Sequence, residues 1–320
     1  MNNSGWLLMS SDYISRDVKF DSTVDSTSIP VASLTKSFNY LRDFEVTVKE
    51  VTDSAFIISG SRDQKRVAML QEEPDVKISA DLMSFYPFYF ALGSISASAT
   101  PPHTIEVNST IPWISLARTL DPVESGESAL LYIYKAKVDN CEMNLEQGDI
   151  GKIDIDLLGT GATLVAGSAD SSPDYTKHAI CFYDMDIAID GSTLPEVSVF
   201  SLAVKNNLDR RLSVSTASGY RAYTIREGGL EITGKIGVGA KALGMLESVL
   251  ERSTEHTITA VLNKTHGTNV TGTITMPCVF FSEYPEKLSG IDPYEIEINY
   301  EAMPPSTGTA LTITTSTLLL

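Results

Sequence analysis

The chain has 320 residues, of which 24 are Lys or Arg and 41 are Asp or Glu, so its formal net charge at pH 7 is −17. Hydrophobic residues make up 42% of the sequence, too many for a disordered chain and enough for a large core. Phosphate binding needs a basic face, so this acidity argues against a protein that grips nucleic acid. It argues equally against attraction to an anionic membrane surface.

No apolar run approaches the roughly 20 residues that a membrane-spanning helix needs. The stretch Met1–Trp6 lacks the basic region and the long apolar segment of a secretion signal. The cysteines Cys141, Cys181 and Cys278 form no CxxC pair, so they indicate a reducing compartment rather than a disulfide scaffold.

Alternation of apolar and polar residues with a period of two dominates the sequence and predicts strands with one buried and one solvated face. The clearest example ends at Glu301: Tyr294, Ile296, Ile298 and Tyr300 share one face, and mostly acidic residues share the other. The other predicted strands are 44–51, 55–59, 76–82, 130–138, 141–145, 153–158, 181–189, 197–204, 230–238 and 270–276.

Helix is predicted in two places. Ala240–Arg252 carries an apolar stripe at helical spacing, and Ser84–Leu92 is a shorter candidate that contains the helix-breaking residue Pro87. The predicted fold is therefore mainly β, an antiparallel β-sandwich or barrel with a flanking α-helix.

Composition divides the chain into an N-terminal arm, two β domains separated by a Ser/Gly/Pro-rich linker, and an extended C-terminal tail. The predicted bounds are 1–36, 37–166, 167–176 (the linker), 177–303 and 304–320. Similar acidic hairpins at Cys141–Leu157 and Tyr183–Leu202 indicate a tandem duplication; the alternative is that any two acidic hairpins look alike.

The residues predict no catalytic, metal or cofactor site, and we expect the protein not to be an enzyme. The stretch Gly234–Lys241 lies where a phosphate-binding loop would lie, but it has neither the lysine of that loop nor the third glycine of a dinucleotide fingerprint. Asp184, Asp186 and Asp190 lack the further ligands of a calcium loop, so we interpret them as the solvated face of a strand.

Two segments of the second half, 197–208 and 223–236, are followed by the predicted helix, a strand, an Asn/Thr/Gly turn and a closing strand that ends at Ala302. In the first half, Phe88–Ser94 and Ala136–Met143 agree with the same pattern. In this order of elements and in these hydrophobic signatures, the chain resembles the tail tube proteins of long-tailed bacteriophages and related archaeal viruses over roughly residues 40–303.

This resemblance implies subunits that join their sheets into a ring, and rings that stack into a tube. It implies a place in the virion tail, assembly in the host cytoplasm, self-association, other tail proteins at the tube ends, and viral DNA that passes through the lumen into the host cell without specific binding. An acidic lumen repels the DNA backbone. The alternative is an acidic β-sandwich binding module, for example a carbohydrate-binding one, against which the presence of only two tryptophans argues.

In this family a long loop reaches toward the next ring, and the matching segment here is Asn207–Gly228. Its arginines could form bidentate pairs with an acidic rim of the neighbouring ring; an ordinary solvated loop is the alternative. The candidate contact residues are Arg210, Arg211, Tyr220, Arg221, Tyr223 and Arg226.

The number of chains in a ring depends on how many tube domains one chain carries. A ring of this family presents six equivalent β domains, so two domains in each chain predict three chains and one domain predicts six. The lengths of the two halves favour three.

Overall fold

The computed structural model describes residues 18–23, 36–38, 41–56, 65–96, 101–120, 129–166, 179–211, 224–239, 254–262, 271–283, 286–287 and 295–316. Every pairing between the strands of these residues is antiparallel. The described part of the chain also contains one α-helix, which packs against the sheets, and this confirms the predicted fold class.

The first half of the chain holds β1 (Val18–Thr23), β2 (Lys36–Ser37), β3 (Leu41–Phe56), β4 (Lys65–Asp81), α1 (Tyr86–Leu92), β5 (Gly93–Ile95), β6 (His103–Val107), β7 (Trp113–Leu120), β8 (Ala129–Glu146) and β9 (Lys152–Ala166). The second half holds the 3₁₀ turn η3 (Phe182–Asp184), β10 (Met185–Ile189), β11 (Ser192–Thr193), β12 (Val197–Lys205), β13 (Asp209–Arg211), β14 (Thr224–Arg226), β15 (Glu231–Gly239), β16 (His256–Leu262), β17 (Gly272–Glu283), β18 (Glu286–Lys287) and β19 (Glu295–Ala302). The C-terminal segment adds β20 (Thr312–Thr315).

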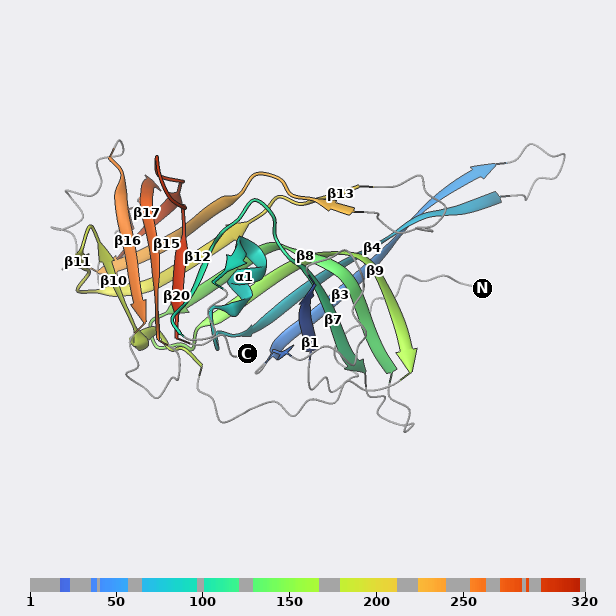
Figure 1. Cartoon of the computed structure of the whole chain (residues 1–320), viewed down its shortest axis with the longest axis horizontal. Helices are drawn as coiled ribbons and strands as arrows, with labels where there is room; N and C mark the ends of the chain where they lie inside the picture. The colour runs from blue at the N-terminus through green and yellow to red at the C-terminus, as the bar shows by residue number, and fades with distance from the viewer. Residues whose placement is uncertain are drawn as a thin grey trace.

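One continuous layer contains strands from both halves, in the order β3-β4-β9-β8-β12-β15-β19 (Figure 1). Strand β8 joins the halves because it changes its partner along one edge. Its first part pairs with β7, which in turn pairs with β1, and its last part, from Asn140 to Glu146, pairs with β12. The register of β8 against β9 shifts between Val138 and Asn140, at the point where the partner changes.

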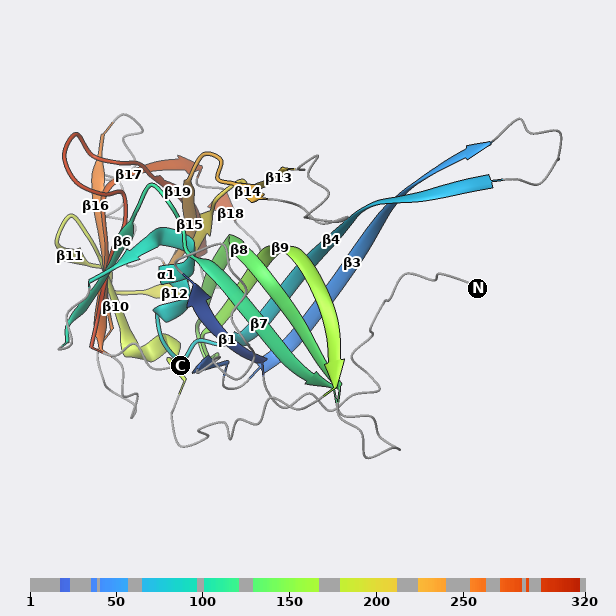
Figure 2. The ribbon, with the colours of Figure 1, turned by 45° about the vertical axis from the view of Figure 1, so that its right-hand side comes forward.

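A second layer contains β10, β16, β17, β20, β6 and β5 (Figure 2). Strand β17 belongs to both layers, because its first residues pair with β20 and its last residues pair with β19. Strand β20 lies in the segment that the sequence predicts to be an extended tail, and it connects β17 of the second half to β6 of the first.

Helix α1 is buried at the centre of the molecule, where it contacts β8, β12, β5 and β6 (Figure 1). The short helix predicted at Ser84–Leu92 is thus confirmed. Pro87 does not interrupt it, because the proline lies in the first turn, where a backbone N–H has no helical partner. The helix ends at Gly93, whose φ of 99° favours glycine. The helix predicted at Ala240–Arg252 lies outside the described residues, as does the predicted linker.

The predicted alternation of faces is confirmed in β19, where Ile296, Ile298 and Tyr300 are buried while Glu297 and Glu301 are exposed. The short predicted strands 130–138 and 141–145 merge into the single strand β8.

The interpretation of Asp184 as a solvated strand residue is wrong, since its exposed fraction is 1%. The strand begins only at Met185, because the preceding residues form η3. Asp184 accepts a hydrogen bond from the backbone N–H of Cys181 at 2.9 Å and so caps this turn.

Tyr300 and Gly234 show how closely the first layer is packed. The Tyr300 hydroxyl donates a hydrogen bond to the carbonyl oxygen of Ser201 at 2.7 Å, which crosses from β19 to β12 over the intervening strand β15. Gly234 lies on β15 directly beneath, and a Cβ atom there would overlap the Tyr300 ring and the Ser201 carbonyl oxygen.

We therefore predict that Gly234→Ala lowers the free energy of unfolding by about 2 kcal/mol, because overpacking forces the Tyr300 ring or the strand to move. Urea unfolding followed by circular dichroism measures the change. Gly229→Ala is the matched control, since a Cβ atom there meets no atom within 4 Å; its effect stays within about 0.5 kcal/mol. Equal stabilities for the two variants would contradict the packing that we describe.

Candidate functional site

The outer face of the first layer is polar across both halves of the chain. The registers align its side chains in rows that cross the strands, and the opposite face forms the core. We call this surface the polar face. One row contains Glu45, Lys77, Asp156, Asn140, Lys205 and Glu231, and another contains Asp81, Lys152, Asn144, Ser201, Lys235 and Asn299.

The row between these two contains carboxylates and no basic residue. We call it the acidic row; it consists of Asp43, Ser79, Asp154, Glu142, Ala203, Thr233 and Glu301. Among its acids, Asp43, Asp154 and Glu301 are exposed and Glu142 is half-buried. Three acids of the row come from the first half of the chain and Glu301 comes from the second, so the row depends on the joining of β8 to β12.

Two acids of the row face each other directly, since Glu142 of β8 pairs with Asp154 of β9. Burial raises the pKa of the Glu142 carboxyl, Asp154 and Asp156 raise it further, and Lys235 lowers it. Like charges placed directly opposite on a sheet are destabilising. The fold therefore keeps a carboxylate pair that works against its own stability.

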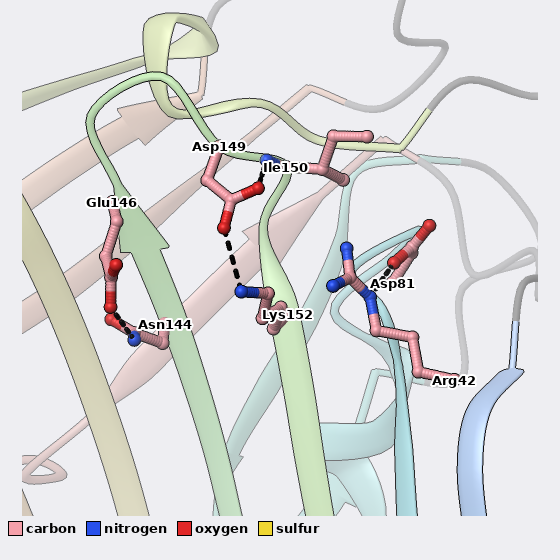
Figure 3. Close-up of polar contacts among 7 residues, drawn as sticks. All are labelled: Arg42, Asp81, Asn144, Glu146, Asp149, Ile150 and Lys152. Atoms are coloured by element: carbon pink, nitrogen blue, oxygen red, sulfur yellow. Dashed lines mark hydrogen bonds and ion pairs between the residues drawn. The ribbon is translucent and has the colours of Figure 1, made fainter.

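The cations near one end of the polar face are bound to other carboxylates (Figure 3). Lys152 donates to Asp149 at 2.8 Å in the β8–β9 turn, and this hydrogen bond, with one from the backbone N–H of Ile150, lowers the pKa of Asp149. Arg42 of β3 pairs with Asp81 of β4 beside it. These cations are therefore engaged locally and do not neutralise the acidic row.

A long hairpin formed by β3 and β4 projects from the body of the molecule (Figures 1 and 2). Strand β4 pairs with β9 only from Asp75 to Asp81, whereas β3 pairs with β4 along its whole length. In the described residues beyond Asp75, the two strands pair only with each other. A two-stranded ribbon of this kind is marginally stable alone in water, so it needs a further surface to pack against.

Near its two ends, the candidate contact loop contains β13 and β14, which pair as a second, shorter hairpin. This hairpin lies on the same side of the molecule as the β3–β4 hairpin (Figure 1). Arg211 and Arg226 lie on it and are exposed, and Arg211 forms an ion pair of 3.0 Å with its neighbour Asp209. Arg210 is instead bound within the chain, to Asp75 of β4. The remaining candidates, Tyr220, Arg221 and Tyr223, lie outside the described residues.

Two features of the site escape prediction from the sequence. The pairing of Glu142 with Asp154 follows from the β8–β9 register, and alternation within a strand does not fix its register against a neighbour, although both segments are predicted as strands. Glu227 forms an ion pair with Lys137, which is 90 positions earlier in the chain. No sequence signal links residues so far apart.

The described residues contain no group of His, Cys, Asp and Glu side chains that could hold a metal ion. Within the same residues, no helix is long and apolar enough to span a membrane.

Comparison with known families identifies the class of protein. The sequence profile of the phage tail tube protein family matches residues 23–314, which is most of the chain. The chain therefore belongs to the phage tail tube protein family, a family of structural, non-catalytic components of the virion tail that assemble with themselves and with other tail proteins. A search of curated proteins finds no match. The match supports the tail tube interpretation over the carbohydrate-binding alternative.

The Glu142–Asp154 pair leads to a prediction about stability and pH. Glu142→Gln removes one of two facing charges and should raise the free energy of unfolding at pH 7 by about 0.5 kcal/mol, the size of a cross-strand pair on a solvated face. The pKa of Glu142 is raised in the folded state, so the ionised Glu142 carboxylate destabilises the fold fully only above that pKa. The gain therefore disappears as the pH falls below the ordinary pKa of a glutamate.

Thermal unfolding of both proteins between pH 3 and pH 8 measures this gain. Glu45→Gln is the matched control, since Glu45 faces Lys77 instead of a carboxylate, and it should lower the melting temperature slightly at pH 7. A destabilising effect of Glu142→Gln at pH 7 would show that the pair is not repulsive.

Proposed function

We propose that this chain is the tail tube subunit of its virus. Copies join their sheets edge to edge in closed rings, the rings stack into a tube, and viral DNA passes through the lumen into the host cell. The observation that carries this proposal is the polar face, which runs in register across both halves while the opposite face forms the core.

The polar face is the surface that lines the lumen in this proposal. A duplex carries a dense array of phosphates, and a wall of the same sign offers it no site at which to bind. The acidic row is suited to this role because it lacks basic residues and because Arg42 and Lys152, at one end of the face, are paired with other carboxylates. The repulsive Glu142–Asp154 pair agrees with a charge that is kept for transport rather than for stability.

Three chains form one ring in this proposal. The first half contributes β3, β4, β9 and β8 to the layer, and the second half contributes β12, β15 and β19. The β8–β12 pairing joins these two sets inside one chain, as ring closure would join them between chains. Each half then counts as one tube domain, and three chains supply the six domains of a ring.

Contacts between copies involve the open edge of β3 and the two hairpins. Among the described residues β3 pairs only with β4, so its other edge can accept a strand of the next chain. The β3–β4 hairpin gains the packing surface that it lacks alone, and Arg211 and Arg226 reach toward an acidic rim of the neighbouring ring. Other tail proteins bind at the tube ends.

We place assembly in the host cytoplasm. The cysteines Cys141, Cys181 and Cys278 are free, which agrees with a reducing compartment.

The main test is the assembly of the purified chain. We expect rings or tubes in negative stain at high protein concentration, and threefold symmetry in a cryo-EM reconstruction of one ring. Native mass spectrometry of a single ring should give three chains. A protein that stays monomeric at all concentrations contradicts the tube, whereas six whole chains in a ring contradict only the assignment of both halves as tube domains.

A charge reversal tests whether the polar face lines the lumen. In Glu301→Lys, the acidic row gains a cation in every subunit, so assembled tubes should retain short duplex DNA at low salt and release it as salt rises. Co-sedimentation of tubes with labelled DNA measures this retention. Glu255→Lys makes the same change of charge at an exposed residue outside the polar face and should retain no DNA. Equal retention by both variants would contradict the luminal assignment.

A further inference from the structure

The β13–β14 hairpin belongs to the second half of the chain, but two ion pairs hold it against the first half. Arg210 lies on β13 and Glu227 directly follows β14, so each strand of the hairpin has an anchor of its own. A hairpin with so few paired residues would not keep a fixed direction without such contacts.

Arg210 makes the first anchor with three acceptors. Its guanidinium donates to the carbonyl oxygen of Pro74 at 2.7 Å, to the carboxylate of Asp75 at 2.5 Å and to the carbonyl oxygen of Gly159 at 3.1 Å. Its side chain is only 13% exposed. Arg210 therefore joins the hairpin to β4 and β9 and has little surface left to offer to another chain.

Glu227 makes the second anchor. Its carboxylate accepts hydrogen bonds from the ammonium group of Lys137 on β8 at 2.5 Å and from the backbone N–H of Ile111 at 3.1 Å. The Lys137 side chain is 8% exposed, and its ammonium group lies 4.6 Å from the centre of the Trp113 ring. A buried ammonium group that loses its carboxylate is strongly destabilised, so this anchor is firm.

The start of the loop is fixed as well. The Asn207 side chain donates to the carbonyl oxygen of Gly229 at 2.8 Å and to the carboxylate of Glu231 at 2.9 Å. The backbone N–H of Leu208 donates to Asp139, at the point where β8 changes its partner. The hairpin thus leaves the sheet in a set direction before any partner binds.

We propose that Arg210 and Glu227 are positioning residues, which aim the β13–β14 hairpin so that Arg211 and Arg226 meet an acidic face of a second copy of this chain. The partner is inferred from charge: the two exposed arginines belong to a chain with a net charge of −17, so another copy presents mostly carboxylates. This inference rests on the proposed function. It gives Arg210 an indirect role, in contrast to the direct contact expected from the sequence.

The test compares tube growth in variants of the full chain. Arg210→Ala should raise the critical concentration for tube formation about tenfold. Without this anchor the hairpin is no longer held in one direction, so Arg211 and Arg226 lose charged hydrogen bonds to the second copy. Arg210→Lys keeps the charge but cannot reach all three acceptors, so its effect should be intermediate. Asp190→Ala is the control, since it removes a different polar contact within the chain, the one of 2.7 Å to His256 in the second layer, outside the surfaces that we propose to contact another copy; it should leave the critical concentration unchanged.

A double-mutant cycle separates positioning from a general structural effect. Arg211→Ala with Arg226→Ala should weaken tube growth in the wild-type background and change it little in the Arg210→Ala background. Glu227→Gln repeats the cycle at the other anchor, which keeps the test decisive where Arg210→Ala fails to fold.

The positioning proposal would be overturned if the anchor substitutions and the Arg211/Arg226 substitutions had additive effects on tube growth. It would also be overturned if both anchor variants formed tubes at the normal critical concentration. Either result would leave the tube function standing. A wild-type chain that forms no tubes would count against the tube function itself.

Discussion

The rest of the structure depends on one backbone constraint: the N–H and C=O groups of a buried strand need hydrogen-bond partners, and one edge of β8 finds them in two strands in turn. It pairs with β7 in its first part and with β12 in its last part. Asp139 lies at the change, where its carbonyl oxygen accepts from the backbone N–H of Asn206, whose side chain donates to the carbonyl oxygens of Val138 and Ala91. These bonds connect β8, β12 and α1 in one buried place, and so they set how the two halves meet.

The joining of the halves gives the first layer one face that packs in the core and one face that is charged. The core face is packed so closely that Gly234 makes room for Tyr300, and the opposite face carries the acidic row. The core provides the stability that the repulsive Glu142–Asp154 pair reduces. The acids of this row lie on β3, β8, β9 and β19, so both halves contribute charge to one face although stability alone does not require it.

The sequence was informative where structure is local. Alternation predicted the faces of β19, and the apolar stretch before Gly93 predicted α1 despite its proline. It failed at Asp184, because a capping carboxylate and a solvated strand carboxylate look alike in an alternating segment. It did not predict the β8–β12 pairing or the Arg210 anchor, since both depend on contacts between residues far apart in the chain, for which one sequence holds no signal.

The C-terminal strand β20 shows why the two halves act as one body. It pairs with β17 of the second half and with β6 of the first, so the halves are joined in the second layer as well as in the first. Neither half can then rotate against the other without breaking a strand pairing. Among the described strands, β3 keeps an open edge, since it pairs only with β4. Its exposed residues Arg42, Asp43 and Glu45 are charged, which discourages unspecific pairing with other edges. In the proposed ring, this edge would accept only a strand of complementary charge and register.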